Sequence, residues 1–301
     1  MSIAKYIKEI GRGKQGARSL SREQAADLFA QVLDGAVTDL EIGGFCLAMR
    51  IKGETAQEMA GFLDATDTRL RHVPAAERPV VVIPSYNGAR KLPALTPLLA
   101  LLLAREGLPV LLHGVASEST RVFTASVLEA LDIPAQATVG PAPAGKVTFV
   151  PTAVLCPGLQ RLLDVRRAVG LRNPAHSLVK IMNPCAGKAL VISSYTHPEY
   201  ALSMAATFEL MHANAMLLRG TEGESVADPR RMPQMDGFLR GQRLLLQEAQ
   251  SGSLPLLPDL PREIDAAGTA RYIRAVLSGD YPTPAPIAQQ VSHVLKMVSQ
   301  L

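Results

Sequence analysis

The hydrophobic pattern of this chain changes its period near Pro79, and that change constrains the fold more than any other feature. Before it, apolar residues recur at helical spacing behind three capping boxes, which begin at Ser21, Thr38 and Thr55. After it, short apolar runs such as Val80-Val81-Val82-Ile83 alternate with helical segments. This order predicts an α/β protein in which helices cover both faces of a mainly parallel central sheet.

The same change of period divides the chain into two domains. A chain of 301 residues is long enough for two modest domains. We expect a small N-terminal helical domain over residues 1–72 and a larger α/β domain over residues 73–301. The predicted strands of the second domain are Val80–Ile83, Val110–His113, Val147–Val150, Ala189–Ser193 and Ala215–Leu218. Residues 222–235 read as a loop, and the portion after them as helices and turns.

Composition narrows the class of protein. The chain is 48% hydrophobic and 19% charged, as expected for a globular protein with a sizeable core. The N-terminus has no apolar signal region, and the longest apolar run, Leu98–Ala104, is far shorter than the ~20 residues that cross a bilayer. The three cysteines are far apart, which favours buried free thiols over disulfides or a zinc site. We therefore expect a cytoplasmic protein without a membrane partner.

Positive charge is concentrated in two windows. The net charge is +4 with a pI near 9.0. Residues 5–18 and 161–180 each carry five cations and one carboxylate, so the remainder of the chain is net negative. Such clustering suits an anionic partner. The alternative is a set of solvated helix faces that never converge.

Several segments together resemble a known family. They are similar to characteristic segments of anthranilate phosphoribosyltransferase and related nucleoside phosphorylases. The resembling segments are Leu33–Asp39, Ala48–Thr55, His113-Gly114, Val127–Leu131, Val165–Arg172, Asn183-Pro184 and Gly220–Gly223. Arg166 lies at the place of the family's anthranilate-binding arginine. The resemblance implies a nucleoside phosphorylase/phosphoribosyltransferase-like fold in which residues from about 160 to 184 join the helical domain in space.

The segments that would hold a diphosphate depart from the family pattern. Pro84–Gly88 replaces the family's glycine-rich G-T-G-G-D loop, and Ser225-Val226 replaces the paired Asp-Glu that binds magnesium. Leu112, Val115 and Ala116 replace the lysine, asparagine and arginine around the His-Gly pair. A diphosphate needs N–H donors and a divalent cation to neutralise its charge. We therefore predict no catalytic residue, no cofactor and no metal site.

Two sets of residues keep a second interpretation at this stage. Glu222, Glu224 and Asp228 could form an acidic metal cluster, but an exposed loop is the simpler explanation. His113 occupies an active-site position, yet no nucleophile or carboxylate lies at a telling spacing from it, which favours a structural role.

Cations and one aromatic side chain take the place of the missing groups. The predicted nucleic-acid-binding residues are Tyr86, Arg90, Lys91, Arg121, Arg166, Arg167, Arg172 and Lys180. In the implied fold these segments face the cleft between the domains, where cations pair with phosphates and an aromatic ring stacks on a base. Tyr86 is either such a stacking residue or a turn tyrosine packed on the sheet edge.

The chain also resembles a second, TrpD-like family of DNA-binding proteins that shares the transferase fold. The resembling segments are Pro84–Lys91, His113–Val115 and Arg219–Glu224. This resemblance implies a homodimer, paired through the N-terminal helices, that binds DNA or RNA in a basic groove largely without sequence preference. The alternatives are a phosphoribosyl or glycosyl transferase and an interaction protein whose groove accepts an acidic partner protein.

Overall fold

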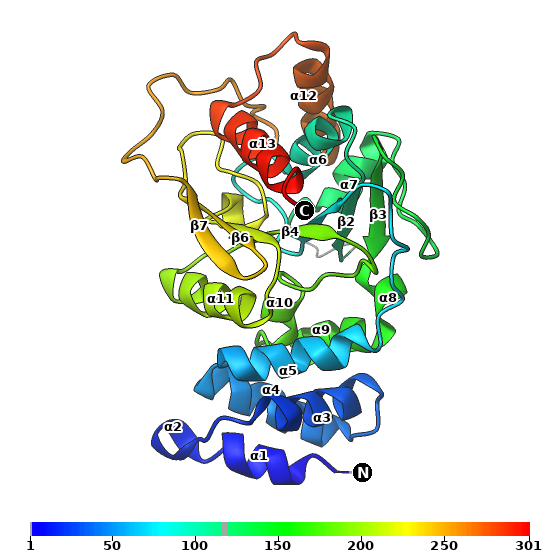
Figure 1. Cartoon of the computed structure of the whole chain (residues 1–301), viewed down its shortest axis with the longest axis vertical. Helices are drawn as coiled ribbons and strands as arrows, with labels where there is room; N and C mark the ends of the chain where they lie inside the picture. The colour runs from blue at the N-terminus through cyan, green and yellow to red at the C-terminus, as the bar shows by residue number, and fades with distance from the viewer. Residues whose placement is uncertain (1, 116–119) are drawn as a thin grey trace. The chain divides into compact units, whose positions relative to one another are not determined.

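The computed structural model describes residues 2–115 and 120–301, and the chain divides into two compact units (Figure 1). The helical unit comprises Met1–Arg71 and Thr152–Pro184, and the sheet unit comprises His72–Pro151 and Cys185–Leu301. No helix among the described residues is long and apolar enough to cross a membrane.

The helical unit consists of short capped helices. They are α1 (Ala4–Ile10), α2 (Gly13–Gly16), α3 (Arg22–Leu33), α4 (Asp39–Lys52), α5 (Ala56–Asp67), α8 (Thr152–Leu155), α9 (Pro157–Val169) and α10 (Ala175–Leu178). The three predicted capping boxes are confirmed: each hydroxyl accepts the N–H of the third helical residue, whose side chain returns the bond. These reciprocal bonds satisfy donors that the helix itself leaves unpaired, so the sequence fixes where α3, α4 and α5 begin.

Three phenylalanines form the centre of the helical unit. The rings of Phe29 and Phe62 stack with their centroids 4.6 Å apart, and Phe45 meets both rings edge-on. All three side chains are completely buried. Because they come from α3, α4 and α5, this cluster joins the capped helices into one core.

The sheet unit contains one seven-stranded sheet within the described residues, in the order β3-β2-β1-β4-β5-β6-β7. The strands are β1 (Val80–Ser85), β2 (Val110–Gly114), β3 (Val147–Pro151), β4 (Ala189–Ser194), β5 (Ala215–Leu218), β6 (Met235–Leu239) and β7 (Gln242–Gln247). The first five pair in parallel, and they are the five predicted strands with small changes at their ends. The predicted α/β class with a mainly parallel sheet is confirmed.

The prediction of helices and turns alone after residue 235 is wrong, because β6 and β7 form an antiparallel hairpin at the edge of the sheet. Its turn consists of Arg240 and Gly241, with φ of 51° and 78°. Two residues with positive φ make the tight turn that matches the twist of a hairpin. The turn uses Arg-Gly in place of the more recognisable Asn-Gly, and β7 is largely exposed, so its sequence lacks a strand's alternation.

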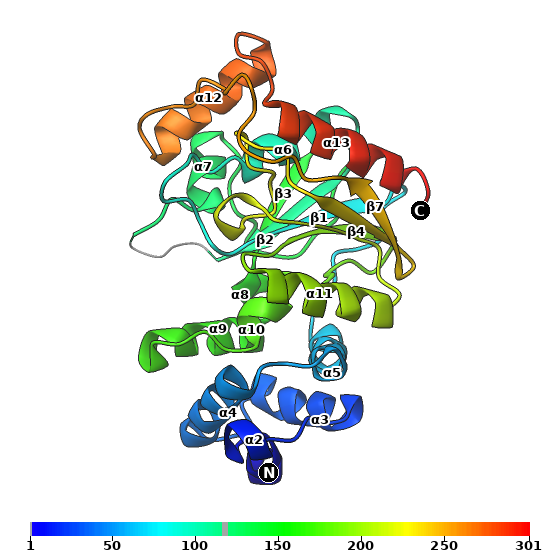
Figure 2. The same ribbon diagram turned by 90° about the vertical axis from the view of Figure 1, so that its left-hand side faces the viewer.

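Helices cover both faces of the sheet (Figures 1 and 2). On one face lie α6 (Thr96–Arg105), α7 (Thr124–Ala130), α12 (Ala266–Ser278) and α13 (Ala285–Val298), while α11 (Pro198–Leu210) lies on the other. The apolar run Leu98–Ala104 lies within α6, and all of its residues except Leu101 are buried. Its leucines pack with residues of β1, β2 and β3 into the main hydrophobic core. This close packing makes that part of the sheet rigid.

Candidate functional site

The order of the strands selects one end of the sheet as the candidate site. The chain runs outward from β1 through β2 to β3, and it then returns to place β4 on the other side of β1. Such a reversal leaves a crevice at the carboxyl ends of the strands, and ligands of open α/β sheets bind there. The segments that follow β1 and β5 at this edge contain Ser85–Leu92 and Gly220–Glu224, and we call them the first loop and the plug segment.

The buried carboxylate of Glu224, in the plug segment, is enclosed by donors of the first loop and by Thr96 of α6. Its Oε1 accepts the backbone N–H groups of Asn87 at 2.6 Å and Gly88 at 2.9 Å. Its Oε2 accepts hydrogen bonds from the hydroxyls of Ser85 and, at 3.3 Å, Thr96. Only 3% of Glu224 is exposed. Because the buried N–H groups of Asn87 and Gly88 would lose their acceptor without it, the carboxylate is part of the folded loop.

A second carboxylate of the plug segment binds the outer part of the first loop. Glu222 Oε2 accepts the backbone N–H groups of Arg90 at 2.9 Å, Lys91 at 3.0 Å and Leu92 at 3.3 Å. Burial alone raises the pKa of this carboxyl, but the three N–H groups and the nearby Arg121 charge lower it below its ordinary value. Glu222 therefore carries a negative charge at the place where the loop collects backbone donors.

Side chains and backbone from several elements hold the plug segment in place. Glu222 has a φ of 52°, in the left-handed region that glycine favours. A Cβ at Gly223, whose φ is 86°, would lie 1.9 Å from Asn87 Nδ2, so only glycine fits there. Ser194 Oγ donates to the carbonyl of Gly223 at 2.7 Å, and the buried Gln290 of α13 bonds the backbone just beyond. The carboxylates are thus delivered by a fixed turn.

Tyr86 is occupied by a contact within the sheet unit. Its hydroxyl lies 2.7 Å from His113 Nδ1, and the two rings meet edge-on with centroids 5.5 Å apart. His113 is completely buried on β2, and this burial lowers its pKa to about 3. The imidazole is therefore neutral near pH 7, and the tyrosine ring is packed against the sheet edge.

The predicted cations of the sheet unit gather around the first loop. Arg121 is half-buried, and its Nη1 donates to the carbonyls of Asn87 at 3.1 Å and Gly88 at 3.3 Å. Arg90 and Lys91 have exposed side chains, although Glu222 binds their backbone N–H groups. Arg121 thus supports the loop from its carbonyl side, while the other two present charge to solvent.

The predicted cations of the helical unit gather around His176. Burial and the charges of Arg172, Arg166 and Lys180 together lower the pKa of His176 to about 4, although a hydrogen bond with the Asn173 backbone opposes the shift. Three of the four predicted residues of this unit are therefore close enough to act on one imidazole. The fourth, Arg167, is exposed and has its guanidinium 3.6 Å from the carboxylate of Asp164.

Several cations elsewhere in the chain form ion pairs with nearby carboxylates. In the N-terminal basic window, Glu9 pairs with Arg12 at 2.6 Å and Arg18 at 3.8 Å. Arg230 and Arg231 pair with Asp228, and Arg243 with Asp236. The cations of these segments are thus at least partly neutralised by carboxylates of the same chain.

The expectation of an exposed acidic loop is wrong for Glu224, which is buried, and Glu222 is half-buried. Among the described residues there is no group of three His, Cys, Asp or Glu side chains that could hold a metal ion. Sequence reasoning missed the role of Glu222 and Glu224 as internal partners of the first loop. The available signal was the loop's long run of backbone donors with no helix before Thr96 to use them.

Comparison of the sequence with known proteins identifies the family of this chain. Residues 4–68 match the helical bundle domain of a glycosyl transferase family. The uncharacterized protein YbiB of Escherichia coli is 42% identical over 300 residues, covering 97% of this chain and 93% of YbiB. Anthranilate phosphoribosyltransferase of Sorangium cellulosum is 30% identical over 272 residues, covering 86% and 76% of the two chains. The chain belongs to the same family as YbiB and anthranilate phosphoribosyltransferase.

Solved structures of TrpD-like proteins share the fold. Anthranilate phosphoribosyltransferase (TrpD) from Thermus thermophilus superposes with a TM-score of 0.69 at 24% identity, covering 95% of this chain and 85% of that enzyme. The enzyme of Saccharomyces cerevisiae in complex with PRPP and Mg gives a TM-score of 0.67 at 15% identity, covering 99% and 88%. On this TrpD-like frame, Ser225 and Val226 are buried, and Ser225 Oγ donates to the carbonyl of Pro84 at 3.0 Å.

Proposed function

We propose that this TrpD-like chain binds nucleic acid, DNA or RNA, largely without sequence preference and without transferase chemistry. The observation that carries the proposal is the occupation of the first loop by the carboxylates of Glu222 and Glu224. A diphosphate could use these backbone N–H groups only by displacing both carboxylates, and the buried Glu224 is fixed in the loop. The side-chain cations remain, and these suit a polyanion that is bound at its surface.

Two groups of cations would contact the phosphates. One consists of Arg166, Arg172 and Lys180 around His176, with Arg167 exposed beside them. The other consists of the exposed Arg90 and Lys91, with Arg121 behind the loop. We assign Tyr86 a secondary role, because its hydroxyl and ring edge are already engaged by His113.

A salt series tests nucleic-acid binding. Fluorescence anisotropy with single- and double-stranded DNA and RNA should show affinity that falls with salt, with a log–log slope of about −0.9 per neutralised phosphate on duplex DNA. Replacing Arg166, Arg167 and Arg172 with Ala should weaken binding to all sequences alike. A flat salt dependence, or a loss confined to one sequence, would contradict the proposal. Competition with an acidic peptide separates an acidic protein partner from nucleic acid.

The second candidate is a phosphoribosyl or glycosyl transferase. The relatives named anthranilate phosphoribosyltransferase favour it, as does Arg166 at the place of the substrate-binding arginine. Against it stand the occupied first loop and the buried Ser225-Val226 pair. Calorimetry with phosphoribosyl pyrophosphate and magnesium distinguishes the two functions, because micromolar binding requires the loop to release both carboxylates.

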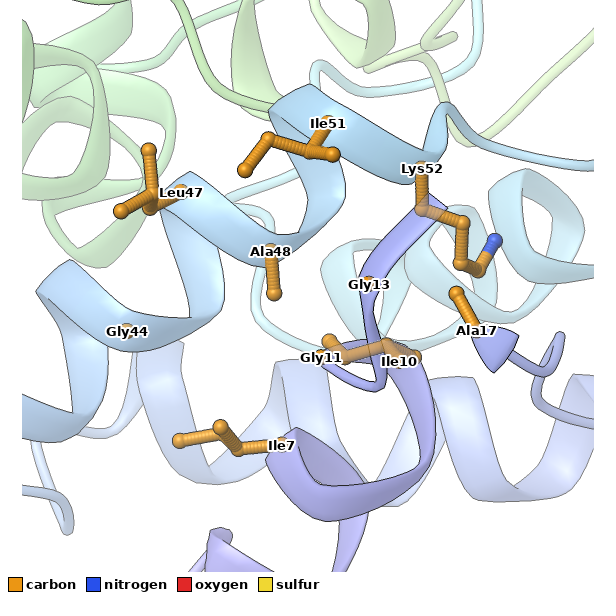
Figure 3. Close-up of a pocket in the computed structure, with 10 residues that line it drawn as sticks. All are labelled: Ile7, Ile10, Gly11, Gly13, Ala17, Gly44, Leu47, Ala48, Ile51 and Lys52. Carbon is orange, nitrogen blue, oxygen red and sulfur yellow. The ribbon is translucent and has the colours of Figure 1, made fainter. Parts of the chain in front are cut away.

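We also propose a homodimer formed through the N-terminal helices. Leu40, Leu47 and Ile51 of α4 are 86%, 47% and 59% exposed, which is unusual for large apolar side chains on one helix. Leu47 and Ile51 border an apolar groove of about 230 Å³ that α1 closes with Ile7 and Ile10 (Figure 3). A second copy of α4 has the apolar side chains to fill it. Light scattering should give twice the chain mass for the wild type and a monomer for Leu47→Glu.

A further inference from the structure

We infer that Glu222 is an exchangeable internal anion, and that the N–H groups it holds form a binding site for an external phosphate group. The inference names the phosphate contact within the proposed nucleic-acid function and in that respect rests on it. The phosphate can come from a nucleic-acid backbone or from the free ion, and the two sources present the same chemistry to the loop.

The donors of this site converge on one point. The backbone N–H groups of Arg90, Lys91 and Leu92 all donate to a single oxygen, Glu222 Oε2. Three consecutive N–H groups directed at one oxygen form the concave arrangement that binds anions. The Arg121 charge acts on the same carboxylate, and Arg90 and Lys91 add exposed cationic side chains. The geometry and the charge of the site thus suit a phosphate.

The two carboxylates of the plug segment differ in how firmly they are held. Glu224 is buried and shares both oxygens among two N–H groups and two hydroxyls, so an outside anion cannot replace it without unfolding the loop. Glu222 is half-buried, and one oxygen accepts all three N–H groups. Solvent therefore reaches the carboxylate, and an incoming phosphate can take over its donors.

The backbone under Glu222 favours this exchange. Its left-handed conformation, with φ of 52°, is one that glutamate adopts only under constraint. Asn87 Nδ2 donates to the Glu222 carbonyl at 3.0 Å, and this bond holds the main chain independently of the carboxylate. The side chain can therefore rotate away while the turn stays in place.

Amide NMR during titration with inorganic phosphate tests the inference. In the wild type, phosphate can bind only during the fraction of time for which Glu222 has left the three N–H groups, and this lowers its apparent affinity by that fraction. Glu222→Ala should therefore bind phosphate about tenfold or more tightly than the wild type. The N–H signals of Arg90, Lys91 and Leu92 should move together. Glu222→Gln keeps an oxygen for these donors but loses the charge, and it should show a smaller gain. Should the Ala variant fail to fold, the Gln variant decides.

A matched control separates this site from a general effect of charge. Glu129→Gln, at an exposed residue of α7 in the same unit, removes the same charge. An equal gain in the control overturns the inference, as do unmoved signals of the three N–H groups in folded Glu222→Ala or Glu222→Gln.

Oligonucleotide titration of the same variants identifies the source of the phosphate. An affinity that rises together with that for phosphate identifies nucleic acid, while an unchanged affinity identifies the free ion. If no variant binds oligonucleotides, the proposed function fails, and the phosphate titration still judges the site.

Discussion

The first loop of the sheet unit and the group around His176 in the helical unit are both rich in positive charge, but they satisfy it differently. In the first loop much of the positive potential comes from backbone N–H groups, and the chain supplies its own carboxylates to them. Around His176 it comes from side chains, and their charge is still strong enough to depress a neighbouring pKa. Fixed backbone donors can be bound by a carboxylate of the same chain, whereas long cationic side chains can change their conformation to meet an anion.

Removing Glu224 should have the largest effect on stability, because its carboxylate binds the buried donors of the first loop. Glu224→Ala leaves the N–H groups of Asn87 and Gly88 buried without an acceptor, which should lower the free energy of unfolding by about 3 kcal/mol or more. Glu222→Ala should cost about 1 kcal/mol, since water can reach its donors. Urea denaturation measures both. Equal losses from the two substitutions would remove the distinction between a fixed and an exchangeable carboxylate.

The second largest effect should come from removing the cations around His176. The triple variant Arg166→Ala, Arg172→Ala, Lys180→Ala should weaken nucleic-acid binding about 100-fold at low salt, at about 1 kcal/mol per lost contact. The pair Arg90→Ala, Lys91→Ala should weaken it about 30-fold by the same measure. The salt slope should become shallower by about one unit per removed phosphate contact. A larger effect from the pair would show that the loop dominates binding.

Two histidines with strongly lowered pKa values, His176 and His113, distinguish the regions by their response to pH and salt. Their pKa values of about 4 for His176 and about 3 for His113 lie below the unfolded value near 6.5. The stability they contribute is complete above pH 6.5 and is lost as pH falls, by about 2 kcal/mol each at pH 5. Added salt should raise the pKa of His176, since nearby cations contribute to its shift. It should leave the pKa of His113 unchanged, because burial alone lowers that pKa. NMR titration at two salt concentrations measures this; equal responses would contradict it.

The smallest effect concerns Arg167. Its ion pair with Asp164 is exposed, so the pair contributes little to folding. Asp164→Asn frees the guanidinium and removes one negative charge, and it should tighten oligonucleotide binding about threefold. Glu129→Gln serves as the control for charge alone, and an equal gain there would remove Arg167 from the interface.

Local features of the fold were predictable from the sequence, and the site was not. The capping boxes were recognisable because each joins residues three apart. Strand β5 (Ala215–Leu218) has the predicted bounds, since a short buried apolar run between turns allows few alternatives. The bonds of Glu224 to Asn87 and Gly88 span more than a hundred residues, and no local pattern records such a pairing. The hairpin was missed because its outer strand is not buried on either face.

The helical unit is discontinuous, and this has a consequence for synthesis. Arg161 of α9 donates to the carbonyl of Leu33 at the end of α3, and Gly158 lies so close to that carbonyl that a Cβ would be 2.2 Å from it. The ribosome makes α9 only after it has made the first three strands. During synthesis, the N-terminal helices therefore remain without the helix that later packs against one of their faces. A truncated chain that stops before α9 should expose this face to chaperones and proteases.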